Sequence, residues 1–171
     1  MAHIELDAFL QAVTSLLDEI HVGPADPRAT WVTSNQAGSG FLGTLDSVPA
    51  SLASRSPAPG LNTMAAHAGH LRYALSLAVR AMRGENPYAS SDWPGSWRTQ
   101  VVDDDAWGAL RADLRSLHTE LLAGIRSGPP VGIDPDMLKG IISLVGHGAY
   151  HLGALRTIHA QLKSMDGTAP R

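Results

Sequence analysis

Four long segments of the chain repeat their apolar residues at steps of three and four positions, the period of one face of an α-helix. They cover about residues 4–21, 64–83, 104–126 and 135–163, and proline, glycine or capping residues lie at their ends. The first, for example, places Leu10, Leu17 and Ile20 on one side. No run of alternating β-branched residues indicates a sheet. The sequence therefore predicts an all-α protein.

The length of 171 residues suits one domain with a single core. We expect an antiparallel four-helix bundle with one long crossover connection. The domain would span residues 1–171, with its core at about 4–163 and a flexible C-terminal tail at 164–171. Two connections are rich in proline and glycine: residues 22–60, with room only for short helical turns near 41–48, and residues 85–102, predicted to be an ordered loop over one end of the bundle.

Composition excludes several functional classes. The formal net charge is −3, from 13 basic and 16 acidic side chains, which gives no electrostatic basis for binding nucleic acid. No stretch approaches the ~20 apolar residues of a membrane span, and the N-terminus lacks the layout of a signal peptide, so we expect no membrane contact and a cytoplasmic location. The chain has no cysteine, so any metal ion would be held by nitrogen and oxygen.

Two pairs of histidines lie on predicted helices. His147 and His151 are spaced i,i+4 on the last helix, so one face of that helix carries both imidazoles. His67 and His70, on the second, could supply a third ligand from a neighbouring helix. Three neutral imidazoles would suit zinc, nickel, iron(II), manganese or cobalt and would leave coordination positions open.

The glycines around this pair are also unusual for a helix interior. Gly146, Gly148 and Gly153 each cost about 1 kcal/mol relative to alanine, which indicates close approach of another backbone or a ligand.

Spacing alone leaves a second interpretation open, in which these histidines only hydrogen-bond each other or backbone carbonyls inside the core. The four remaining histidines are expected at the surface or at helix ends: His3, His21, His118 and His159.

The two histidine motifs resemble those of the DinB-like superfamily, whose members are four-helix-bundle candidate metalloenzymes. Residues 147–153 are similar to its H-x-x-x-H signature on the last long helix. Residues 63–71 are similar to its second-helix motif, in which a Ser or Thr, here Thr63, precedes the first metal histidine by seven positions. The resemblance thus implies His70, His147 and His151 as ligands of a divalent metal ion. His67 resembles an extra histidine that some members carry one turn earlier, which leaves open whether it assists or replaces His70.

Residues 92–97, ahead of an Asp-capped third helix, also resemble one branch of this family. The sequence departs from the family pattern beside both histidine motifs: Leu61 or Asn62 stands where many members have tryptophan, and Ala154 where many have glutamine. These changes leave the three ligands in place and alter the pocket around them.

The resemblance also implies a class of reaction. Characterised relatives include metal-dependent transferases and isomerases that use low-molecular-weight thiols such as bacillithiol or mycothiol, and such chemistry needs no cysteine from the protein. A divalent ion with three neutral ligands lowers the pKa of a bound thiol or water. We identify no general base: Tyr150, Trp93 and Trp97 are better explained by packing.

Three hypotheses follow. The first is a metal-dependent thiol S-transferase or a hydrolase-like enzyme. The second is a metal-binding stress-response or sensing protein without turnover. The third is a non-catalytic dimeric helical scaffold without a metal. A homodimer is compatible with all three.

Overall fold

The computed structural model describes residues 5–128 and 132–167 of the chain, and no strand occurs in these two ranges. The predicted all-α class is confirmed. Four long helices carry the fold, namely α1 (Leu6–His21), α4 (Met64–Met82), α5 (Asp104–Ser127) and α6 (Pro135–Met165). The connections contain two short helices, α2 (Phe41–Asp46) and α3 (Ala50–Ala53), and two 3₁₀ turns, η1 (Pro87–Ser90) and η2 (Gly95–Trp97).

Capping side chains start three of the long helices where the sequence indicates. The Thr63 hydroxyl accepts a hydrogen bond from the Ala66 N–H at 3.1 Å, and Asp103 and Asp134 cap α5 and α6 in the same way. Residue 4, the predicted start of the first helix, lies outside the described residues. So do residues 168–171 of the predicted tail, whereas 164 and 165 belong to α6.

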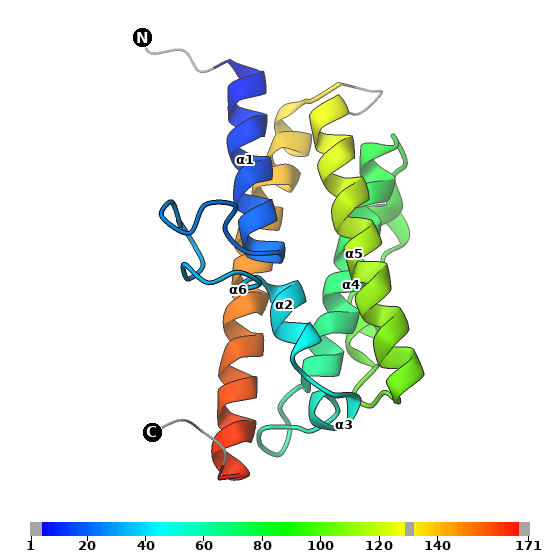
Figure 1. The fold of residues 1–171 in the computed structure, drawn as a ribbon. Helices are drawn as coiled ribbons and strands as arrows, with labels where there is room; N and C mark the ends of the chain where they lie inside the picture. Colours follow the sequence, from blue (N-terminus) through cyan, green and yellow to red (C-terminus); the bar gives the residue numbers. More distant parts are fainter. Residues whose placement is uncertain (1–4, 129–131, 168–171) are drawn as a thin grey trace.

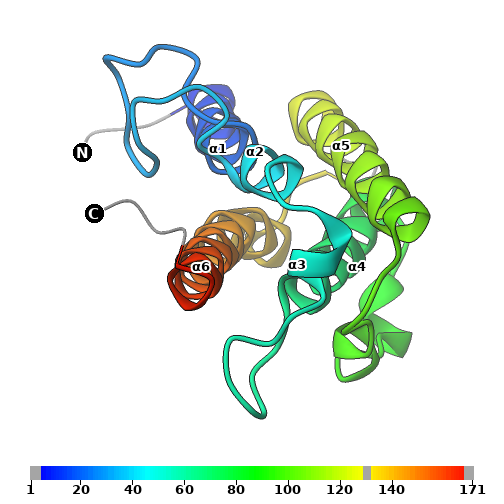
Figure 2. The same ribbon diagram turned by 60° about the horizontal axis from the view of Figure 1, so that its bottom comes forward.

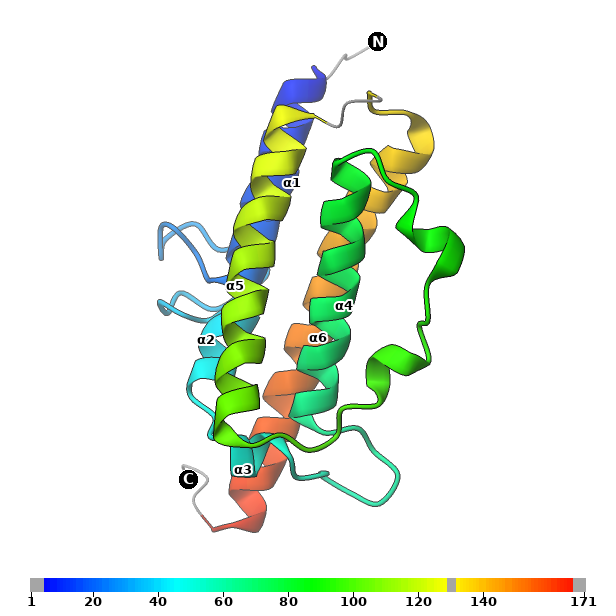
Figure 3. The ribbon, with the colours of Figure 1, turned by 90° about the vertical axis from the view of Figure 1, so that its right-hand side faces the viewer.

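The four long helices lie side by side (Figures 1 and 2). Helices α1 and α6 run in one direction, and α4 and α5 run in the other. Because α4 and α5 are neighbours that point the same way, the chain between them must return along the whole of α4, about 28 Å at 1.5 Å per residue. Residues 85–102 therefore descend beside α4 (Figure 3). Their predicted position over one end of the bundle was wrong.

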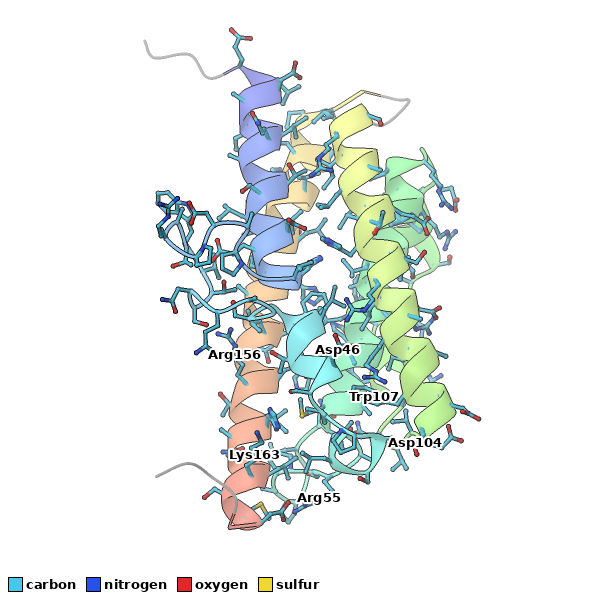
Figure 4. All side chains as sticks on the ribbon, viewed as in Figure 1. Asp46, Arg55, Asp104, Trp107, Arg156 and Lys163 are labelled. Carbon is cyan, nitrogen blue, oxygen red and sulfur yellow. The ribbon has the colours of Figure 1, made fainter. Side chains whose placement is uncertain are left out.

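The segment that contains the two short helices α2 and α3 packs against α5. Trp107, 1% exposed, points from α5 toward the α2–α3 segment and donates its indole N–H to the Val48 carbonyl at 2.8 Å (Figure 4). Asp46 on α2 forms ion pairs with Arg111 and Arg115 of α5. The connection thereby becomes part of the core packing.

Two of the histidines that were expected at the surface or at helix ends are buried in the core. His21 does end α1, but His118 lies in the interior of α5, so the expectation was wrong for His118. His21 is 1% exposed and His118 is 8% exposed. Their Nδ1 atoms are 2.9 Å apart, and His118 Nε2 lies 3.1 Å from an Asp18 carboxylate oxygen. The physical reason is that the apolar face of α1 continues through its last residue, and the imidazole pair satisfies its own hydrogen bonds there. His159 is half-buried, and His3 lies outside the described residues.

A buried carboxylate organises the long connection after α1. Glu19 is 5% exposed and accepts hydrogen bonds from the backbone N–H groups of Trp31, Val32 and Thr33 at 2.7–3.1 Å, and from the Thr33 hydroxyl at 2.9 Å. These charge-assisted bonds tie the loop to α1.

None of the helices in the described part of the chain is both long and apolar enough to cross a lipid bilayer.

Candidate metal centre

Helices α4 and α6 bring three histidines to one point. His70 comes from the first half of α4, and His147 and His151 come from successive turns of α6. His147 Nε2 lies 3.1 Å from the Nε2 of His70 and 3.1 Å from the Nε2 of His151. One nitrogen from each ring lies within 4.8 Å of the others, so the cluster could hold a metal ion.

Two of the three distances between these nitrogens match what a small divalent ion requires, and the third is within 4.8 Å. Zinc–imidazole bonds of 2.0–2.1 Å at tetrahedral angles put two ligand nitrogens about 3.3 Å apart. The two 3.1 Å separations are close to that value. The donor set also fits, because the cluster offers nitrogen alone and the described residues around it add no thiolate.

A serine hydroxyl determines which nitrogen of His70 carries the proton. Ser96 Oγ donates its one hydrogen to the Trp93 carbonyl at 2.6 Å. It must therefore accept the hydrogen bond from His70 Nδ1, which is 2.7 Å away. His70 is then protonated on Nδ1, and the lone pair on its Nε2 faces the other two histidines.

A tight turn in the connection holds Ser96 in that position. The Asp92 carboxylate accepts a hydrogen bond from the Gly95 N–H at 2.8 Å, and a Cβ atom on Gly95 would lie only 2.0 Å from that carboxylate. A larger residue at position 95 would therefore displace the Asp92 carboxylate from this turn. One residue after Ser96, Trp97 stacks on the His70 ring, with centroids 4.1 Å apart and planes 19° from parallel.

His67 lies behind the cluster and contacts one of its members. Its Nδ1 is 2.9 Å from His151 Nδ1, on the side of that ring away from the three converging nitrogens. The structure does not place it in the group that could hold a metal ion. His67 is therefore positioned to orient His151, as hydrogen-bonded partners of metal-ligating histidines commonly do, and does not take the place of His70.

Burial keeps all the imidazoles of the cluster neutral. It lowers the pKa of His70 to about 4 and that of His151 to about 3, and the nearby histidines add to both shifts. Burial also lowers the pKa of His147 and of His67. Neutral imidazoles offer the lone pairs that metal binding requires.

The glycines of α6 do not all have the role expected from the sequence. A Cβ atom on Gly148 would lie 3.0 Å from the Ile20 side chain, so α1 does approach α6 closely there. Cβ atoms on Gly146 and Gly153 would meet nothing within 4 Å. For these two, the expected close approach is absent from the described part of the chain.

Two candidate side chains stand at the edge of the cluster. Tyr150 is 66% exposed and meets the His151 ring edge-on at 4.9 Å. Trp93 lies 5.8 Å from the His70 ring, between centroids. Both side chains contact the cluster through their rings alone, and we assign neither of them a catalytic role.

Sequence reasoning missed Ser96, which orients His70. The signal was present in the Asp92-to-Gly95 turn ahead of it, because an Asp three residues before a Gly is typical of a side-chain-capped turn. The contact itself depends on that turn packing against α4, which local sequence does not reveal.

Comparison with known proteins identifies the family of this chain. A sequence model of the DinB superfamily matches residues 35–155, which include α4, the returning connection, α5 and the two histidines of α6. No curated protein and no solved structure matches the chain. The matched region is more than half of the chain and carries all three histidines of the cluster, and this protein belongs to the DinB superfamily.

Proposed function

We propose that this protein is a metal-dependent enzyme that holds a divalent ion on His70, His147 and His151 and transfers a low-molecular-weight thiol to an electrophile. One observation supports it most strongly: three neutral imidazoles converge through Nε2 at an end of a cavity of about 930 Å³ between α4 and α6, which His70 and His147 line. A buried histidine cluster that served only the core would not need an adjoining cavity of ligand size.

A divalent ion on three neutral ligands would lower the pKa of a thiol bound beside it. The residues of the chain orient the ligands. Ser96 and His67 keep the ring nitrogens aimed inward, and Trp97 covers one face of His70. In the transfer itself the thiol loses its proton to solvent, its sulfur forms a bond to the electrophilic carbon, and the leaving group departs with its electron pair.

The test is turnover with a matched histidine control. Zinc-, nickel- and manganese-loaded protein is assayed with bacillithiol, mycothiol and N-acetylcysteine against 1-chloro-2,4-dinitrobenzene. We expect a rate above that of the free thiol with at least one pair, its loss in His147→Ala/His151→Ala, and its retention in His159→Ala, a histidine of the same helix outside the cluster. Stoichiometric metal without turnover across an extended electrophile panel would instead support the metal-binding protein without turnover.

We propose three further features with this function. The four long helices form a bundle with one long crossover, in which α1 and α6 are antiparallel to α4 and α5, the protein acts in the cytoplasm, and it is a homodimer. Two-fold pairing is common for soluble proteins of this size. Light scattering during size-exclusion chromatography tests the dimer, which a mass of 18.0 kDa in solution would contradict.

A further inference from the structure

The cavity beside the histidine cluster is elongated. Its walls come from the second half of α4, from the first half of α6 and from the connection that follows α4. Along α6 it extends from His147 back to Asp136, eleven residues, which corresponds to about 16 Å. His70 and His147 mark one end. The opposite end lies where α4 stops and α6 begins (Figure 3).

The middle of the cavity is apolar because α4 presents only small side chains to it. Ala74 and Ala78 lie one turn apart on that helix, and Ile141 and Leu144 face them from α6. Methyl groups in place of larger side chains leave the space between the helices open, and aliphatic walls favour an apolar occupant through the area it removes from water.

The far end of the cavity is acidic. Glu85, Asp134 and Asp136 line it, and among the described lining residues there is no lysine or arginine. Arg80 pairs with Glu85 and Lys139 with Asp136, but neither cation lines the cavity, so each offsets only part of the negative charge that the carboxylates present to an occupant. Asp134 also caps α6, so its carboxylate already meets the positive end of that helix. A carboxylate or phosphate on a bound molecule would meet like charge here.

We propose that the cavity binds an elongated, apolar substrate whose outer end carries no negative charge, and that this substrate is the electrophile brought to the histidine cluster. The assignment as substrate rests on the proposed thiol-transfer function, whereas the binding preference depends only on the cavity walls. The arrangement selects against polycarboxylate molecules in this cavity and admits aliphatic or aromatic bodies with a neutral or cationic terminus.

Binding of three probes with the same apolar body tests the preference. Isothermal titration calorimetry on chelator-treated full-length protein compares 1-octanol, octyltrimethylammonium and octanoate, so that coordination to a metal does not contribute. We expect octanol and octyltrimethylammonium to bind at least tenfold more tightly than octanoate. Octanoate that binds as tightly as octanol overturns the proposal, as does the absence of measurable binding by all three.

A pair of glycine substitutions locates the binding. Gly140 lines the cavity, and a Cβ atom there would meet nothing within 4 Å, so Gly140→Leu fills open space without a clash. Gly153→Leu, on the same helix and equally free of neighbours, lies outside the cavity. We expect Gly140→Leu to weaken octanol binding at least tenfold and Gly153→Leu to leave it unchanged. Equal affinities in the two variants would refute the proposed location.

A second pair tests the charge at the outer end. Glu85→Gln/Asp136→Asn removes two carboxylates of the cavity, and Asp113→Asn removes an exposed one on α5. We expect the double variant to reduce the difference in affinity between octanol and octanoate, and Asp113→Asn to leave that difference unchanged. An unchanged difference in the double variant would contradict the charge argument. Metal content and turnover are separate measurements, so a cavity that prefers octanol in a protein without metal or activity would refute only the proposed function.

Discussion

Acid should destabilise this protein through a histidine outside the metal cluster. Burial, with a smaller contribution from His118, lowers the pKa of His21 to about 3 in the folded chain, whereas the unfolded chain has the ordinary value of 6.5. Between these two pH values the unfolded state binds a proton that the folded state does not. The free energy of unfolding therefore falls as the pH drops below 6.5, with a slope that approaches about 1.4 kcal/mol per pH unit, and by nearly 5 kcal/mol over the whole interval.

Urea unfolding followed by circular dichroism, at pH values from 7.5 to 5.0 and with a chelator present, measures this loss. His21→Leu/His118→Leu is the comparison, because a single substitution would leave the partner imidazole without its hydrogen bond. The histidines of the cluster remain in both proteins, so their contribution cancels in the difference. Between pH 6.5 and 5.0 the wild type should lose at least about 1.6 kcal/mol more than the variant, because the lowered pKa of His118 adds to the contribution of His21. Equal slopes would refute the assignment of His21 as a buried, neutral group.

Three further predictions concern single positions. Gly148→Ala places a Cβ atom 3.0 Å from buried Ile20, whereas the new Cβ atom in Gly146→Ala meets nothing. Gly146→Ala should therefore raise the free energy of unfolding by about 1 kcal/mol, and the value for Gly148→Ala should be at least about 1 kcal/mol lower than that for Gly146→Ala. Equal melting temperatures of the two variants would contradict the packing of α1 on α6. His67→Phe removes the partner of His151 and should weaken metal binding about 10- to 100-fold in a competition with a chromophoric chelator, with partial recovery in His67→Gln; an unchanged affinity would exclude an orienting role. Glu19→Gln weakens the charge-assisted hydrogen bonds to residues 31–33 and should lower the free energy of unfolding by about 2 kcal/mol. The amide hydrogens of residues 31–33 should also exchange faster with solvent, and unaltered exchange would contradict the role of Glu19 in holding this loop.

The helices could be predicted because their signals are local. Thr63, Asp103 and Asp134 cap the helices that the apolar periodicity indicates, and each cap is made within three residues of its own position. The direction of α5 relative to α4 was not predictable in this way. It depends on how the two helices pack, which decides whether residues 85–102 close an end of the bundle or return along its side.

The residues of the histidine cluster were predictable from the sequence, but their hydrogen-bonded partners were not. The i,i+4 spacing of His147 and His151 places both on one face of a helix from sequence alone, and the family motif adds His70 from another helix. Which ring nitrogen faces the centre depends on Ser96 and His67, contacts that form only after α4 meets the connection and α6. The burial of His21 was missed because polarity was given more weight than its place on the apolar face of α1.

Metal stoichiometry tests the central claim most directly. Protein purified without a histidine tag is incubated with zinc, nickel or manganese, desalted and analysed by inductively coupled plasma mass spectrometry, beside His147→Ala/His151→Ala treated in the same way. We expect about one divalent ion per chain in the wild type, because three neutral imidazoles converge at His70, His147 and His151, and none in the variant. No bound ion in the wild type with any of the three metals would contradict the metal centre and leave these histidines as hydrogen-bonded residues of a helical core.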